Sequence, residues 1–256
     1  MLNRKVLLLA PVEFGRFEGT TYLFDNPGKA LQTDESGLPA IACDLSDPKH
    51  ELYRFLHDGL TERLRVVRLM DHYGLRPVPA TALHVTACDH VNPLNVEELV
   101  PSARERYEKF LKDMPGSLLA PPPGLLPPIE FYPAGTTARP IRFDYVRLGI
   151  LARELALVAL VEPSDSASRE VFRQISERRH ALELQEADRI GKPIEPAWAP
   201  HVTLAYFTSE GRAESARAEL AAWDAAMRGG AAPGCIEFTN IHLYAFTDMT
   251  RFLRVG

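Results

Sequence analysis

The sequence has few cysteines, and no spacing pattern connects them. Three cysteines occur in 256 residues. They are Cys43, Cys88 and Cys235, and none belongs to a C-x-x-C pair. An odd number of widely separated thiols is typical of a reducing compartment and does not predict a disulfide framework. We therefore expect a cytoplasmic protein without disulfides.

Long apolar runs are also missing. The apolar run at residues 6–10 ends at Pro11, and Glu13 and Arg16 follow closely, whereas a transmembrane helix requires about 20 apolar residues. The same run is short for the apolar region of a secretory signal peptide. We therefore expect neither a membrane span nor a membrane partner.

Positive charge is not in excess. The 29 Lys and Arg residues are outnumbered by 34 Asp and Glu residues, which gives a formal net charge of -5. Binding of long nucleic acids depends on many Lys and Arg contacts with phosphates. The composition therefore disfavours a long nucleic acid as partner, and a phosphate-bearing substrate should be small or held at one end. For such a chain we expect a monomer.

One short motif occurs twice. Residues 82–87 read ALHVTA, and residues 199–204 read APHVTL. In an extended strand successive side chains point to opposite faces, so each copy places one imidazole and one hydroxyl on the same face. The pairs are His84 with Thr86, and His201 with Thr203.

The two motifs lie within a longer repeat. A strand, a helix, a proline-containing loop and a motif strand recur in the same order, which indicates two similar lobes. We predict that the lobes are built from about residues 37–89 and 154–207 within a single domain, 1–256. The histidines are 117 positions apart, and this offset also relates identical residues: Phe55 and Phe172, Pro79 and Pro196, Ala80 and Ala197, Val85 and Val202, and Thr86 and Thr203.

The rest of the pattern predicts both strands and helices. A capping box of Ser102 and Glu105 is expected to begin the second helix. Residues 114–128 are rich in proline and are expected to form an extended crossing between the halves. We expect strands at residues 5–14, 20–24, 38–43, 141–147, 154–161, 236–246 and 252–255, and helices at residues 48–67, 102–114, 166–182 and 212–227.

The paired motifs suit acid–base chemistry at phosphorus. An imidazole has an ordinary pKa of about 6.5, so near neutral pH one ring can accept a proton while another donates one. An in-line displacement needs such a base and acid, and threonine hydroxyls can donate to the non-bridging oxygens. The residues therefore predict catalysis by His84 and His201, with Thr86 and Thr203 holding the phosphate, and require neither a cofactor nor a metal.

Paired His-x-Thr motifs, one in each half of a chain of this size, resemble those of the two-histidine (2H) phosphoesterase superfamily, which includes 2',3'-cyclic phosphodiesterases and the bacterial RNA 2',5'-ligase type. The resemblance implies an α+β, bilobal, duplicated fold with two antiparallel sheets flanked by helices around a central cleft. It also implies a metal-independent hydrolase that opens a 2',3'-cyclic phosphate or cleaves a 2',5'-type linkage in a small nucleotide or RNA end. His84 and His201 would be acid and base, in an order that stays open.

Several alternatives and secondary candidates remain. A non-catalytic module that binds a phosphorylated nucleotide ligand would carry the same motifs. Cys88 shares the strand parity of His84 and is expected in the cleft wall. Residues 1–36 and the proline-rich crossing either cap the cleft or widen the scaffold. A metal site with His84 and His90 fits no standard ligand spacing. Three further residues are candidates for substrate contact: Phe207, which shares the parity of His201, and Arg142 and His242.

Overall fold

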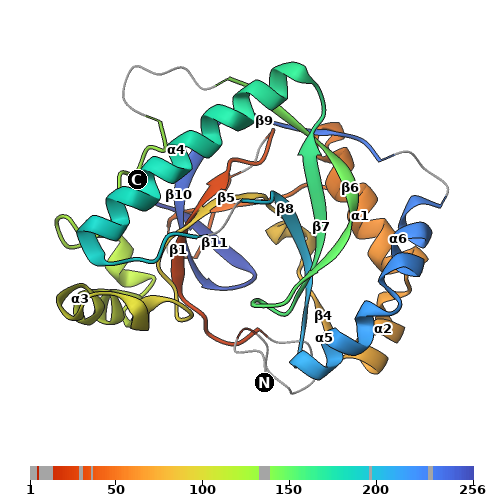
Figure 1. Cartoon of the computed structure of the whole chain (residues 1–256), viewed down its shortest axis with the longest axis horizontal. Helices are drawn as coiled ribbons and strands as arrows, with labels where there is room; N and C mark the ends of the chain where they lie inside the picture. The colour runs from red at the N-terminus through yellow and green to blue at the C-terminus, as the bar shows by residue number, and fades with distance from the viewer. Residues whose placement is uncertain are drawn as a thin grey trace.

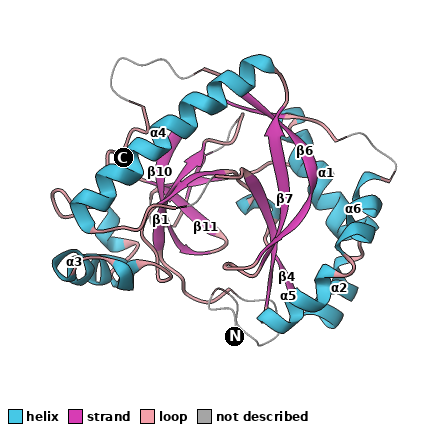
Figure 2. Ribbon diagram, in the orientation of Figure 1, coloured by secondary structure: helices cyan, strands magenta, loops and turns pink. Residues whose placement is uncertain are grey.

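The computed structural model describes residues 5, 14–28, 31–35, 37–132, 139–195, 198–229 and 233–256. They form two antiparallel sheets with helices around them (Figures 1 and 2). The predicted α+β class with two antiparallel sheets is therefore confirmed. Most of the strand predicted at residues 5–14 lies outside the described residues, as do the repeat partners Pro196 and Ala197.

The first sheet has the strand order β2-β3-β11-β10-β1-β5. Its centre is the pairing of β1 (Gly19–Phe24) with β10 (Ile241–Asp248), in which Gly19 lies opposite Phe246 and Phe24 opposite Ile241. Every residue of β1 is buried, so this strand lies inside the core. The remaining strands are β2 (Leu31–Thr33), β3 (Pro39–Ile41), β5 (Thr86–Asp89) and β11 (Arg251–Arg254).

The second sheet has the strand order β4-β8-β7-β6-β9. Its centre is a long hairpin of β6 (Ile141–Leu151) and β7 (Ala156–Pro163), and β8 (His201–Phe207) pairs with β7. The edge strands are β4 (Leu75–Pro77) and β9 (Ile236–Phe238).

The two sheets meet at the motif strands. Val85, immediately before β5, forms an isolated antiparallel bridge with Val202 of β8. The edge of the first sheet therefore lies against a strand of the second, and the two motifs are brought side by side.

Helices cover the outer sides of the sheets (Figure 2). The long helix α4 (Ser166–Ile190) begins at Asp165, whose carboxylate accepts a hydrogen bond from the Ser168 N–H. It packs against β5 as well as β6 and β7, so it bridges both sheets.

In the described part of the chain, no helix combines the length and apolar character needed to cross a bilayer. The other α-helices are α1 (Glu51–Asp58), α2 (Val66–Tyr73), α3 (Pro101–Lys112), α5 (Glu210–Arg217) and α6 (Leu220–Arg228), with short 3-10 or π-helical turns at Pro48–His50, Gly59–Arg63, Ala80–Ala82, Val96–Glu98 and Gly116–Leu118.

Some predicted boundaries are wrong. Residues 236–246 do not form one strand. The extended structure is interrupted at residues 239–240, and β9 and β10 on either side belong to different sheets. The last predicted helix is divided into α5 and α6. Helix α3 begins at Pro101 without a side-chain cap, so the capping box of Ser102 and Glu105 does not form. Proline is well suited to this first position, since it has no N–H to satisfy.

The strands that pair with the two motif strands do not occupy equivalent positions in the sequence repeat. β5 pairs with β1, at residues 19–24, whereas β8 pairs with β7. The sequence repeat instead aligned residues 38–43, which contain β3, with β7. In the sheet, β3 is separated from β5 by β11, β10 and β1. The division into lobes near residues 37–89 and 154–207 therefore stays a prediction.

A stability prediction follows from the turn between α2 and β4. Gly74 adopts a left-handed φ of 60°, and a Cβ added there would lie 2.3 Å from Thr208 Oγ1. We expect Gly74→Ala to lower the free energy of unfolding by about 1–2 kcal/mol, measured by urea denaturation. Gly211→Ala, within α5 and with no atom within 4 Å of the added Cβ, should instead stabilise by up to about 1 kcal/mol. Equal effects of the two variants would contradict this account.

Candidate active site

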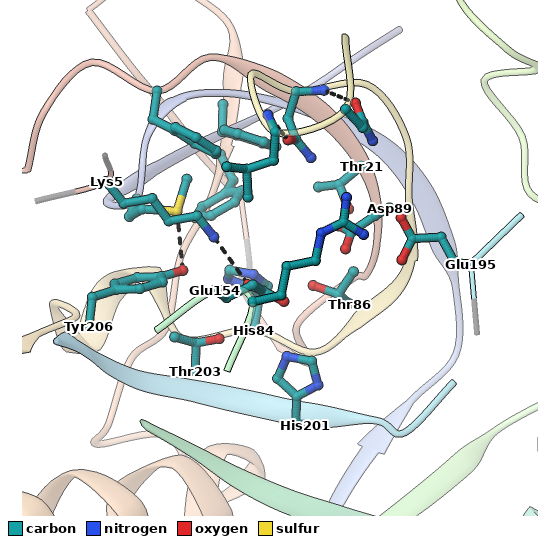
Figure 3. Close-up of a pocket in the computed structure, with 18 residues that line it drawn as sticks. Lys5, Thr21, His84, Thr86, Asp89, Glu154, Glu195, His201, Thr203 and Tyr206 are labelled. Atoms are coloured by element: carbon teal, nitrogen blue, oxygen red, sulfur yellow. Dashed lines mark hydrogen bonds and ion pairs between the residues drawn. The ribbon is translucent and has the colours of Figure 1, made fainter. Parts of the chain in front are cut away.

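A pocket opens where the two sheets meet (Figure 3). All four residues of the paired motif line it: His84, Thr86, His201 and Thr203. The structure thus brings together the four side chains that the sequence singled out, from the edge of one sheet and from a strand of the other.

The bridge between Val85 and Val202 sets which side chains are neighbours. In an antiparallel pair, the residues one position before and after a bridge also lie opposite each other. His84 therefore lies across from Thr203, and Thr86 lies across from His201. Figure 3 shows this arrangement, with each imidazole beside the threonine of the other strand.

Both imidazoles are held in the same way. Nδ1 of His84 is 2.7 Å from the carbonyl oxygen of Ala82, and Nδ1 of His201 is 2.9 Å from that of Ala199. A carbonyl oxygen only accepts, so Nδ1 of each ring is the donor. In the neutral form, Nε2 is then the nitrogen with the free lone pair. The two rings share one tautomer because each hydrogen bonds to the backbone two residues earlier.

The surroundings of His84, which is partly exposed, distinguish it from an ordinary histidine. Removal from solvent lowers the pKa of His84 to about 4, and the nearby His201 also lowers it. The ring of Phe252 covers the imidazole, with the two ring centroids 4.2 Å apart. At neutral pH His84 is therefore uncharged and able to accept a proton through Nε2.

Both motif strands contain a β-bulge immediately after the threonine. In β5, Leu23 pairs with Thr86 and Tyr22 with Cys88, so Ala87 is the extra residue. In β8, Val158 pairs with Thr203 and Leu157 with Ala205, so Leu204 is the extra residue. A bulge shifts the alternation of side chains by one position. The side chains that face the pocket beyond the bulges are therefore Asp89 and Tyr206.

The bulges explain two wrong predictions. Cys88 does not line this pocket and instead packs in the core near Tyr22. Phe207 is fully buried in the core, so it cannot stack on a nucleotide base in the pocket. Asp89 and Tyr206 were missed, although they are themselves 117 positions apart. The repeat offset, applied beyond the threonines, could have identified them as a pair.

Two other substrate-contact candidates lie away from the pocket. Arg142 is more than half exposed on β6, and its Nε is 2.7 Å from a carboxylate oxygen of Glu237. His242 on β10 lies between Asp25, 2.8 Å from Nδ1, and Arg254, 2.6 Å from Nε2. Neither side chain lines the pocket that holds the motif residues, so the structure does not bring them to the candidate site.

The candidate metal ligand His90 also has other partners. It is buried, with Nδ1 2.6 Å from Thr20 Oγ1 and Nε2 3.0 Å from Glu186 of α4. These contacts tie β1, the chain after β5 and α4 together. Among the residues that the structure describes, no group of three or more His, Cys, Asp and Glu side chains is arranged to hold a metal ion.

The pocket wall contains more carboxylates than cations. Asp89, Glu154 and Glu195 line it, together with Lys5 and Arg153. Burial raises the pKa of Asp89, with Glu154 and Glu195 adding to the effect. The charge of Lys5 lowers the pKa of Glu154. The apolar part of the wall is formed by Phe17, Leu94, Phe246, Met249 and Phe252.

No family model matches the chain, and no curated protein matches it. Similar solved structures include a conserved protein of unknown function from Agrobacterium tumefaciens, with 15% identity, 94% of this chain and 86% of that chain covered, and a TM-score of 0.48. Escherichia coli LigT complexed with 3'-AMP has 12% identity, 90% and 88% coverage and a TM-score of 0.39. Usb1 of Kluyveromyces marxianus has 10% identity, 94% and 98% coverage and a TM-score of 0.40.

The environment of His84 predicts an unusual titration. Its pKa is lower in the folded protein than in the unfolded chain, so the unfolded chain binds more protons between about pH 4 and 6.5. We expect its imidazole resonances to titrate near pH 4 by NMR, with assignment by loss of the signal in His84→Gln. The free energy of unfolding should therefore decrease as the pH falls from about 6.5 to 4, because protons bind the unfolded chain preferentially in this range. A midpoint near 6.5 would show that the ring is not desolvated.

Proposed function

We propose that this protein is a metal-independent phosphodiesterase that opens a 2',3'-cyclic phosphate, or cleaves a 2',5'-type linkage, in a nucleotide or RNA end. The observation that carries the proposal is the convergence of His84 and His201 on one pocket, each with Nε2 as the free nitrogen and a threonine hydroxyl from the opposite strand beside it.

The different surroundings of the two rings support a division of roles. His84 is neutral at pH 7 and is the general base, so its Nε2 takes a proton from the attacking water. The water oxygen bonds to phosphorus as the bond to the ribose oxygen breaks. His201, protonated on Nε2, gives its proton to that leaving oxygen. The product is a phosphomonoester with a free hydroxyl, and proton exchange with solvent restores both rings.

The threonines supply hydrogen bonds where charge develops. Thr86 and Thr203 lie on the pocket side of their strands, next to the rings. Their hydroxyls donate to the non-bridging oxygens of the phosphoryl group, which carry most of the negative charge during the displacement.

The charge of the pocket favours a diester over a monoester. A cyclic phosphate or an internucleotide linkage carries one negative charge. A phosphomonoester carries between about 1.5 and 2 at pH 7, because its second pKa is near 6. Glu154 and Glu195 line the wall, and their carboxylates repel the doubly charged product more strongly than the singly charged substrate. This difference assists product release.

Substitution of either histidine should abolish most of the activity. We expect His84→Ala and His201→Ala each to lower kcat about 10²–10⁴-fold on a panel of 2',3'-cyclic nucleotides and 2',5'-linked oligonucleotides, since each removes one proton transfer. Thr86→Val and Thr203→Val should lower kcat by up to about 10³-fold. Wild-type activity should survive EDTA.

His180→Ala, at an exposed position on α4, is the matched control and should retain full activity. Full activity in either motif variant would remove that histidine from the mechanism. Tight binding of these ligands by the wild type, without product after long incubation, would instead favour a binding module.

Inhibition by the product should weaken as the pH rises. Through about pH 6 the monoester gains its second negative charge, whereas the charge of the diester substrate is constant. We therefore expect the ratio of the product inhibition constant to KM to increase between pH 5.5 and 8, measured by steady-state kinetics. Because both constants refer to the same free enzyme, its own ionisations affect them equally and cancel in the ratio. A constant or falling ratio would show that the carboxylates do not act on the bound phosphate.

A further inference from the structure

A buried lysine from the N-terminal segment reaches the pocket. Lys5 is only 6% exposed, yet it lines the same wall as the paired motif (Figure 3). Burying an ammonium group is costly unless it is paired. Arg153, the other cation that lines the pocket, has a side chain that is 60% exposed and an ion pair with Glu98 at 3.6 Å. Lys5 is therefore the cation enclosed with the motif residues.

Groups from the second sheet and from the residues before β1 hold the ammonium in place. Its Nζ lies 3.1 Å from Oε2 of Glu154, in the turn between β6 and β7. It also lies over the rings of Tyr206 and Phe17, at 4.8 and 5.1 Å from their centroids. Tyr206 is the residue that the bulge in β8 turns toward the pocket. Such a cage fixes one position for the charge.

The ammonium is also connected to the motif residues. Tyr206, whose ring lies next to the ammonium, follows Thr203 on β8, and both side chains line the pocket. The Tyr206 hydroxyl donates a hydrogen bond to Sδ of Met249, 3.2 Å away. The charge of Lys5 acts on His84 and lowers its pKa. A phosphoryl group held by Thr203 beside His84 would therefore lie next to the ammonium.

We propose that Lys5 binds the phosphoryl group of the substrate, its ammonium contacting a non-bridging oxygen while Glu154 and Tyr206 position it. This inference rests on the proposed function and deepens it, because it gives the N-terminal segment a part in substrate binding. Without Lys5, Glu154 and Glu195 would line the wall without an enclosed lysine or arginine beside them.

Three variants test this role. Lys5→Met keeps the apolar stem and removes the charge, and we expect it to raise KM about 10- to 100-fold, the range for a lost hydrogen bond to a charged group. Lys5→Arg should recover most of the loss. Loss of the positive charge near His84 should raise the pKa of this imidazole. The acidic limb of the pH profile of kcat/KM should therefore lie at higher pH in Lys5→Met than in the wild type. Lys49→Met, at an exposed position, removes one positive charge outside the pocket and should leave KM unchanged.

The double variant Lys5→Met/Glu154→Gln separates phosphate binding from a structural ion pair. If Lys5 only neutralises Glu154, removing both charges should restore the wild-type KM, and this result would overturn the proposal. If Lys5 binds phosphate, KM should stay high. Thermal unfolding of each variant reports whether the fold is retained, and Lys5→Arg supplies the readout if Lys5→Met does not fold.

Failure of the proposed function would give a different result. If the wild type turns over none of the diesters, calorimetric titration with inorganic phosphate and a nucleoside monophosphate tests Lys5 directly. Binding by the wild type that weakens at least about tenfold in Lys5→Met would support the phosphate contact without catalysis. Absent binding, or equal binding by the two proteins, would overturn it.

Discussion

The backbone pairing of Val85 with Val202 is the contact on which the site depends. It is an isolated bridge, because β5 continues in one sheet beside β1 and β8 continues in the other beside β7. The pairing therefore joins the sheets at one point and leaves the flanking side chains facing a pocket. The positions of His84, Thr86, His201 and Thr203 follow from this register, since each lies one residue from the bridge.

The two motifs repeat in backbone geometry and differ in surroundings. Each imidazole hydrogen bonds to the carbonyl two residues earlier, and each strand bulges after its threonine. The side chains that the bulges present differ, however, since one is the carboxylate of Asp89 and the other the phenol of Tyr206. The two imidazoles therefore share their backbone hydrogen bonds but have different neighbours in the pocket wall.

Sequence periodicity predicted the site up to the bulges and failed beyond them. Strand alternation placed each histidine and threonine on one face, as the structure has them. The extra residues Ala87 and Leu204 have no composition that marks a bulge, unlike the glycine of some bulge types, so Phe207 was placed on the wrong face. Arg142 was misplaced because its partner Glu237, opposite it on β9, is distant in the sequence. The α+β class was predictable, since it depends on local patterns that the sheets preserve.

The described part of the N-terminal region contributes to both the first sheet and the pocket. β1 lies between β10 and β5 and is buried throughout, so the first motif strand has its only long pairing with this segment in the described structure. Phe17 and Thr21, just before and within β1, line the pocket together with Lys5. Burial of a charge depends on contacts between distant segments, so no pattern around Lys5 could have predicted its place. Residues near the N-terminus thus provide both a central strand of the first sheet and a cation in the pocket wall.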